Sequence, residues 1–157
     1  MISLSFSEIA EAVKGDLIQG DANALTSGQV FTDSREVGPG DIFFAKLGEF
    51  DDGHKYLRQV STVGASLAVV QVVDPELPIP QIKVSNSVTA LADLARHVLE
   101  KVRANGKLKV IGITGSNGKT STKSMLNQIL SEFGPVVAPR GSYNNDVGMP
   151  LTVLRLE

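Results

Sequence analysis

The sequence contains no cysteine and no tryptophan, and aromatic residues make up only 5% of its 157 residues. Without cysteine the chain forms neither a disulfide nor a thiolate metal site. It has no run of about 18 apolar residues, which argues against a membrane-spanning helix. Residues 1–15 lack a basic segment followed by a continuous apolar one, so we expect no signal peptide and a cytoplasmic protein.

The charge of the chain is nearly balanced, with 15 Lys and Arg against 17 Asp and Glu and a formal net charge of −2. This balance gives no general attraction to nucleic acid or to an anionic membrane, and we expect neither as a partner. A hydrophobic content of 42% can furnish a core. The length predicts one or two domains.

Residues 1–105 predict a small α/β domain. Ser5 and Glu8 have the spacing of a capping box at the start of a short helix. Two further helices are predicted over 54–63 and 87–104, each from an apolar stripe at helical spacing. Short strands are expected around Leu17 and over 29–31, 41–45, 67–73 and 81–84.

Residues 106–157 predict the incomplete start of a P-loop nucleotide-binding α/β domain. Strand candidates at 110–113 and 136–138 flank a helix over 119–133, and a brief helix can begin at Pro150. A doubly wound domain usually needs more parallel strands than these. We therefore interpret the chain as an N-terminal piece of a longer enzyme.

The segment Gly112-Ile-Thr-Gly-Ser-Asn-Gly-Lys-Thr120 has the composition of a phosphate-binding loop between a strand and a helix. Glycines let backbone N–H groups point at phosphate oxygens, and the helix N-terminus adds positive potential. The strict pattern has glycine where this chain has Ile113, so the alternative is a tight turn with a solvated lysine. We predict that Lys119 neutralises phosphate charge and that the Thr120 hydroxyl ligates Mg²⁺. The predicted nucleotide contacts are Thr114, Gly115, Ser116, Asn117, Gly118, Lys119 and Thr120.

Five segments occur in the order seen in the Mur ligases, the ATP-dependent amide ligases of bacterial peptidoglycan synthesis. The chain resembles the first domain and the start of the central domain of that family over essentially its whole length. The last segment favours the branch that joins D-alanyl-D-alanine to UDP-N-acetylmuramoyl-tripeptide over the branch that adds the third amino acid. The segments are Thr32-Asp-Ser-Arg35, Phe43-Phe-Ala45, Gly48 through Asp52-Gly-His54, Thr114 through Thr120, and Asn144-Asn-Asp-Val-Gly-Met-Pro150.

This resemblance implies a ligase that transfers the γ-phosphoryl group of ATP to a carboxylate, forming an acyl phosphate that the incoming amine attacks. Catalysis of this kind rests on positioning and charge stabilisation, with Lys119 as the catalytic residue. Residues 1–105 would then bind the UDP-muramoyl-peptide, and residues 106–157 would bind ATP with Mg²⁺. Because the family's acidic metal ligands and third domain would lie beyond residue 157, we expect this piece alone to be inactive.

Two polar segments are candidates for substrate contact. Ser34 and Arg35 can contact uracil edges, a diphosphate or a carboxylate, although an Asx or Ser turn with a surface ion pair is the alternative. Asn144, Asn145 and Asp146 follow a strand candidate, at the edge where open α/β sheets bind ligands, although such residues mostly make turns. We predict substrate contact for all five residues.

Other functions stay open at this point. They are another Mur ligase branch, a different P-loop enzyme such as a small-molecule kinase or a folylpolyglutamate synthase relative, and a UDP-sugar-binding module without catalysis. The N-terminal domain disfavours both P-loop alternatives. A kinase has no use for such a domain, and the folate-adding relatives generally lack it. His54 either faces the nucleotide-sugar or makes a loop hydrogen bond, and His97 is expected at the surface or boundary of its helix.

Overall fold

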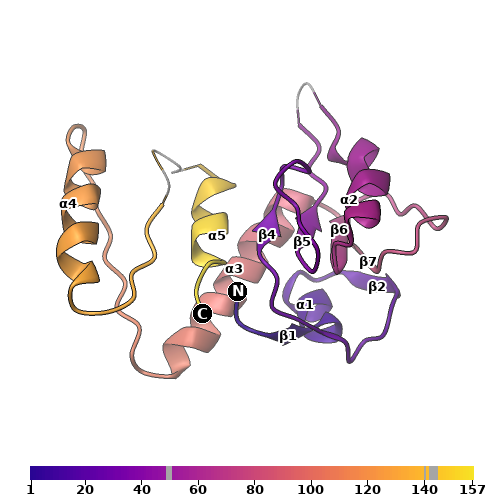
Figure 1. The fold of residues 1–157 in the computed structure, drawn as a ribbon, viewed down its shortest axis with the longest axis horizontal. Helices are drawn as coiled ribbons and strands as arrows, with labels where there is room; N and C mark the ends of the chain where they lie inside the picture. The colour runs from indigo at the N-terminus through magenta and orange to yellow at the C-terminus, as the bar shows by residue number, and fades with distance from the viewer. Residues whose placement is uncertain (49–50, 140, 142–144) are drawn as a thin grey trace.

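The computed structural model describes residues 1–48, 51–139, 141 and 145–157. The larger of its two sheets has the strand order β2-β7-β6-β5-β4, in which β4 to β7 are parallel and β2 is antiparallel to β7 (Figure 1). A smaller sheet pairs β1 with β3. The strands are β1 (Leu4–Ser5), β2 (Asp16–Gln19), β3 (Leu25–Thr26), β4 (Val30–Phe31), β5 (Ile42–Phe44), β6 (Leu67–Val70) and β7 (Gln81–Lys83).

Helices cover both faces of the larger sheet. Helices α1 (Phe6–Ala12) and α3 (Ser87–Ala104) share one apolar cluster with Ile42 and Phe44 of β5. The 3₁₀ helix η1 (Gly53–Tyr56) leads into α2 (Leu57–Val63), which packs on the opposite face with Phe43. Because both faces are covered, β5 and β6 bury every residue and read in the sequence as continuous apolar runs.

The helix starts follow the capping signals in the sequence. The Ser5 hydroxyl oxygen accepts a hydrogen bond from the Glu8 N–H at 3.1 Å, as the capping box predicts. At the start of α3, Asn86 Oδ1 accepts from the N–H groups of Val88 and Thr89, both at 2.9 Å. The structure confirms the three helices and five strands that the sequence predicts in residues 1–105. It also contains the β1–β3 pair, which the sequence did not predict.

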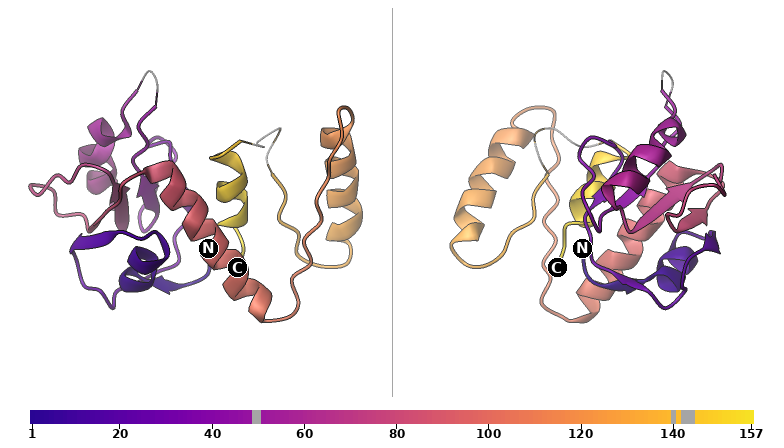
Figure 2. Two further views of the ribbon diagram at one scale, coloured as in Figure 1. Left: turned by 180° about the vertical axis from the view of Figure 1, so that it is seen from behind. Right: turned by 45° about the vertical axis from the view of Figure 1, so that its right-hand side comes forward.

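The C-terminal part of the chain is less packed. Helix α4 (Lys119–Ser131) forms as predicted but stands apart from the sheet and buries none of its residues (Figure 2). Helix α5 (Gly148–Val153) lies against α3, and Leu154, which is 1% exposed, joins the apolar cluster of residues 1–105. The domain boundary between residues 105 and 106 stays a prediction. The apolar cluster of residues 1–105 extends across it, because residues of α5 and Leu154 pack against that cluster.

Two predictions for this part are wrong. The strand candidates 110–113 and 136–138 form no strand, since neither sheet in the described residues includes them. A strand needs a neighbour to receive its backbone hydrogen bonds, and here Val110 and Ile111 are exposed instead. The brief helix expected at Pro150 is present as α5, which begins two residues earlier at Gly148. No helix in the described part of the chain is long and apolar enough to cross a bilayer.

Candidate functional site

The glycine-rich segment 112–118 turns directly into the N-terminus of α4. Gly115 and Gly118 adopt φ angles of 146° and 79°, which only glycine adopts without strain. The space where a side chain at Gly118 would lie is open to 4 Å. No side chain of the described residues caps α4, and its first turn contains no acidic residue. The helix start therefore offers backbone N–H groups to an anion.

Lys119 and Thr120 occupy the first two positions of α4. Lys119 is half-buried, and its Nζ donates a hydrogen bond back to the Gly115 carbonyl oxygen, so the side chain folds over the loop. Thr120 is exposed in the first helical turn. The predicted residues Thr114, Gly115, Ser116, Asn117 and Gly118 are exposed in the loop.

This loop fits a nucleotide phosphate better than it fits a metal alone. The exposed N–H groups and the Lys119 ammonium suit phosphate oxygens. Among the described residues there is no group of three or more His, Cys, Asp or Glu side chains that could hold a metal. Mg²⁺ in such sites keeps waters and phosphate oxygens and needs few protein ligands, so the Thr120 hydroxyl fits as a single ligand.

A cleft of about 430 Å³ lies between α4 and residues 136–139. Residues 136–139 form one side of this cleft, and hydrogen bonds from two cationic side chains hold this part of the chain. Lys123 Nζ donates to the carbonyl oxygens of Pro139 and Gly141 at 2.8 and 2.7 Å, and Arg155 Nη1 donates to that of Ala138 at 3.0 Å. These bonds keep the segment beside α4 although no second strand pairs with it.

A second candidate site lies at the carboxyl end of β4. Arg35 N and Nε both donate to Asp33 Oδ1, at 3.0 and 2.9 Å, and Nη2 donates to Oδ2 at 2.6 Å. The guanidinium beside Asp33 lowers the pKa of that carboxyl to about 2. Ser34 is buried, whereas the Arg35 side chain is 83% exposed and keeps N–H donors toward solvent. The geometry is that of the Asx turn with an ion pair, and substrate contact by Ser34 and Arg35 stays a prediction.

The other predicted substrate segment lies at the start of α5. Asn145 Oδ1 accepts from the N–H of Gly148, the first residue of α5, at 2.8 Å, so this side chain makes a local hydrogen bond within the turn before the helix. Asp146 is exposed, and Asn144 lies outside the described residues. Substrate contact by Asn144, Asn145 and Asp146 stays a prediction.

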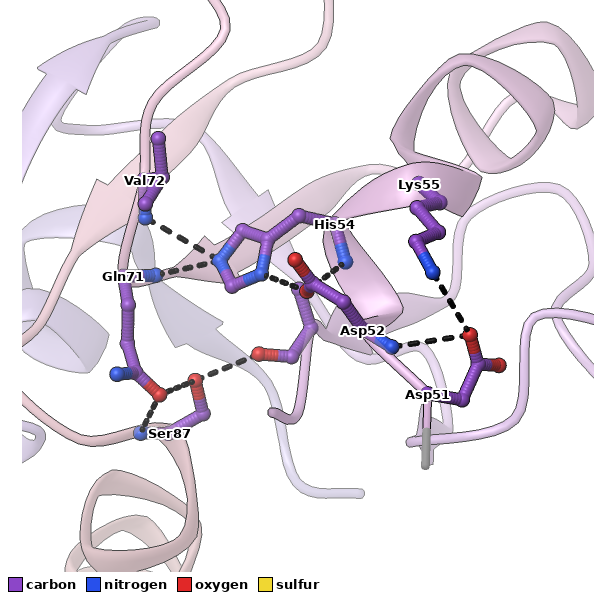
Figure 3. A network of polar contacts seen from close by, with 8 residues as sticks. Asp51, Asp52, His54, Lys55, Gln71, Val72 and Ser87 are labelled. Carbon is purple, nitrogen blue, oxygen red and sulfur yellow. Dashed lines mark hydrogen bonds and ion pairs between the residues drawn. The ribbon is translucent and has the colours of Figure 1, made fainter. Parts of the chain in front are cut away.

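His54 makes the loop hydrogen bond that was one of its two expected roles (Figure 3). Its Nδ1 lies 2.6 Å from Asp52 Oδ1, and its Nε2 accepts from the N–H groups of Gln71 and Val72 at 2.9 and 3.2 Å. A hydrogen bond from the His54 backbone N–H is the main cause that lowers the pKa of Asp52. His97 is a boundary residue of α3, as expected, with its Nε2 2.8 Å from Glu8 Oε1.

Two polar residues of this region, Gln71 and Ser87, were not among the predicted site residues. Gln71 follows the apolar strand β6, and its Oε1 accepts from the N–H of Ser87 at 3.2 Å. The Ser87 hydroxyl donates to the Ala45 carbonyl oxygen at 2.6 Å in a buried setting. The sequence signal for Gln71 was its position as a polar residue directly after the apolar run of β6.

Residues 113–157 match the Mur ligase middle domain family. Over 99% of its length the chain is 39% identical to the UDP-N-acetylmuramoyl-tripeptide–D-alanyl-D-alanine ligase of Mycobacterium bovis and 38% identical to that of Escherichia coli, covering 34% and 33% of those proteins. The chain belongs to the Mur ligase family. It spans about a third of the length of these relatives.

Solved Mur ligase structures have the same fold. The ligase that adds D-alanyl-D-alanine in Acinetobacter baumannii is 35% identical, with a TM-score of 0.86 over 99% of this chain and 34% of that one. The MurF ligase of Thermotoga maritima, solved in complex with ADP, is 32% identical, with a TM-score of 0.68 over 82% of this chain and 29% of that one. The predicted α/β fold class is confirmed.

Proposed function

We propose that this chain is the N-terminal part of an ATP-dependent ligase that joins D-alanyl-D-alanine to UDP-N-acetylmuramoyl-tripeptide in peptidoglycan synthesis. The observation that carries the proposal is the similarity to ligases of that name over 99% of the chain. A cytoplasmic location and a role in cell-wall formation are parts of the same proposal.

Residues 106–157 would bind ATP through the loop before α4. Residues Thr114 to Gly118 surround the phosphates with backbone N–H groups, Lys119 stabilises charge on the transferred phosphoryl group, and Thr120 holds Mg²⁺. When bound, ATP supplies the γ-phosphoryl group that activates the tripeptide carboxylate for attack by the dipeptide amine. Lys119 now bonds the Gly115 carbonyl oxygen, so binding requires its Nζ to turn toward the phosphates.

Residues 1–105 would bind the UDP-muramoyl-peptide at the carboxyl ends of β4 to β7. Open α/β sheets bind ligands at this edge, and both Arg35 after β4 and the polar network after β5 and β6 lie there. The exposed donors of Arg35 suit a diphosphate or carboxylate. Asn145 and Asp146 would contact the same substrate from the start of α5.

A titration of the 157-residue chain tests both proposed binding roles. Adding UDP-N-acetylmuramoyl-tripeptide should shift amide NMR signals after β4, β5 and β6, whereas ATP with Mg²⁺ should shift those of residues 112–120. A UDP-sugar-binding module without catalysis predicts the first set of shifts and not the second. If neither ligand moves any signal at millimolar concentration, the proposed function is wrong. We expect no phosphate release by this chain alone.

A further inference from the structure

His54 lies where two parallel strands end side by side. Strands β5 and β6 are paired in register, and the chain leaves them at Ala45 and Gln71. The segment that contains His54 comes between these strands in sequence and returns to the same edge of the sheet. This is the edge at which the proposed nucleotide-sugar substrate binds.

The contacts of the imidazole select one tautomer. Nε2 accepts two hydrogen bonds, from Gln71 N–H at 2.9 Å and Val72 N–H at 3.2 Å, and an accepting nitrogen carries no proton. The proton therefore lies on Nδ1 and is donated to Asp52 Oδ1 at 2.6 Å. The His54 side chain is only 10% exposed, so solvent replaces these partners poorly. His54 is neutral and bonded at both nitrogens.

The same segment is also fixed to the end of β5. The Gly53 N–H donates to the Lys46 carbonyl oxygen at 2.9 Å, and Leu47 and Asp52 form an antiparallel bridge. A side chain at Gly53 would meet the Lys46 nitrogen at 2.8 Å, so only glycine permits this approach. Gly53 and His54 together tie the residues after β5 to the residues after β6.

The start of α3 completes this connection. The Ser87 hydroxyl donates to the Ala45 carbonyl oxygen, and Gln71 Oε1 accepts from the Ser87 N–H (Figure 3). His54 therefore bonds the backbone of Gln71 while Ser87 bonds its side chain. The ends of β5 and β6 and the first residue of α3 form one polar network.

The 3₁₀ helix that contains His54 also carries Tyr56. The Tyr56 hydroxyl donates to Asp51 Oδ2 at 2.8 Å. This Asp51 bond is the main cause that raises the pKa of Tyr56, and the charges of Asp33 and Arg35 also act on it.

We propose that His54 is a positioning residue that fixes the nucleotide-sugar-binding edge of the N-terminal sheet by accepting the N–H groups of Gln71 and Val72. This role rests on the proposed binding of UDP-N-acetylmuramoyl-tripeptide. His54 acts through the backbone of the two strand ends and does not touch the reacting atoms.

The first test reads the tautomer without any ligand. The chain has two histidines, so a long-range ¹H–¹⁵N spectrum contains two imidazoles, and His97→Gln assigns them. We expect His54 Nε2 at the chemical shift of an unprotonated nitrogen and Nδ1 at that of a protonated one. The reverse pattern, or an even mixture of tautomers, overturns the proposal.

The second test uses two variants that each keep half of the imidazole's bonds. In His54→Gln the amide oxygen lies near the position of Nε2 and can accept from the Gln71 and Val72 N–H groups. In His54→Asn the amide matches Nδ1, keeps the Asp52 bond and leaves those N–H groups unpaired. His97→Gln is the matched control, since it removes the other imidazole, which bonds Glu8 on the opposite side of the domain.

Calorimetry with UDP-N-acetylmuramoyl-tripeptide, well below the melting temperature of each variant, gives the decisive numbers. We expect His54→Asn to weaken binding about tenfold or more, and His54→Gln and His97→Gln to stay within about threefold of the wild type. ATP binding should be unchanged in all of them, which a general loss of folding would not produce.

The remaining outcomes separate the two proposals. If His54→Asn binds the UDP substrate as tightly as the wild type, the positioning role is wrong while the proposed function stands. If His54→Gln loses as much affinity as His54→Asn, the imidazole contacts the ligand directly and the positioning role is again wrong. If the wild type itself does not bind, the proposed function is wrong and the role of His54 falls with it.

Discussion

Helices α3 and α4 differ so strongly in burial that the same kind of substitution should destabilise the chain in α3 and have almost no effect on its stability in α4. Leu94 on α3 is fully buried in the main apolar cluster, whereas Ile129 on α4 is 57% exposed. Truncating a buried leucine removes its transfer free energy and leaves a cavity, which costs about 2–5 kcal/mol. We expect Leu94→Ala to destabilise the 157-residue chain by that amount.

Ile129→Ala is the matched control on the unburied helix. It removes a side chain of the same volume class from a helix that buries none of its residues. Alanine is also the better helix former, so the free energy of unfolding should change by less than about 0.5 kcal/mol. For a chain of this length, the Leu94 change corresponds to a fall in melting temperature of roughly 4–20 °C.

Thermal unfolding followed by circular dichroism measures both variants, since the chain has no tryptophan to report by fluorescence. Hydrogen exchange by mass spectrometry adds a local readout, in which α3 amides should exchange much more slowly than α4 amides. Equal destabilisation by Leu94→Ala and Ile129→Ala, or equal protection of the two helices, would refute the assignment of stability to the N-terminal core.

Three further predictions concern charged residues. Lys119→Ala should weaken ATP binding by the chain and cut turnover of the whole enzyme by roughly a hundredfold or more, without a change in melting temperature; near-normal turnover would exclude a role in phosphoryl transfer. Arg35→Ala should weaken UDP-N-acetylmuramoyl-tripeptide binding about ten- to a hundredfold and leave ATP binding unchanged, and NMR titration should show the pKa of Asp33 rising from about 2 toward its ordinary value. A hydrogen bond from Lys14 and a weaker contribution from Arg96 lower the pKa of Asp93 below its ordinary value. The stability that the ionised Asp93 gives the fold is therefore present above about pH 4 and is lost as the pH falls through its folded-state pKa. Asp93→Asn should remove that part of the acid sensitivity in urea titrations, and an unchanged pH profile would show that the two ion pairs contribute nothing.

The N-terminal domain was predictable because its local signals agree with its packing. Caps at Ser5 and Asn86 mark real helix starts, and the apolar runs of β5 and β6 correspond to strands buried on both faces. The β1–β3 pair was not predictable, since two strands of two residues each carry no periodic pattern. The segment 110–113 has a strand's composition, but strand formation depends on a partner that sequence alone does not supply.

The candidate sites were likewise predictable where their contacts are local in sequence, and not where the partners lie far apart in the chain. The spacing of glycines before Lys119 indicated the loop at the start of α4, because a phosphate-binding turn is contiguous in sequence. The role of His54 was left open because its partners lie 17 and 18 residues farther along the chain. Asn145 was assigned to substrate from its position after a strand candidate, and only the structure shows that its side-chain oxygen accepts the N–H of Gly148, the first residue of α5.

The contact of α5 with α3 has a practical consequence for anyone who shortens this protein. A chain cut after residue 105 would retain every strand of both sheets and yet lose Leu154, which lies in the same cluster as Leu91 and Leu94. The uncovered stripe of α3 would face water, and apolar stripes of that kind promote self-association. Solubility would then be limited by a surface that belongs to the interior of the longer chain.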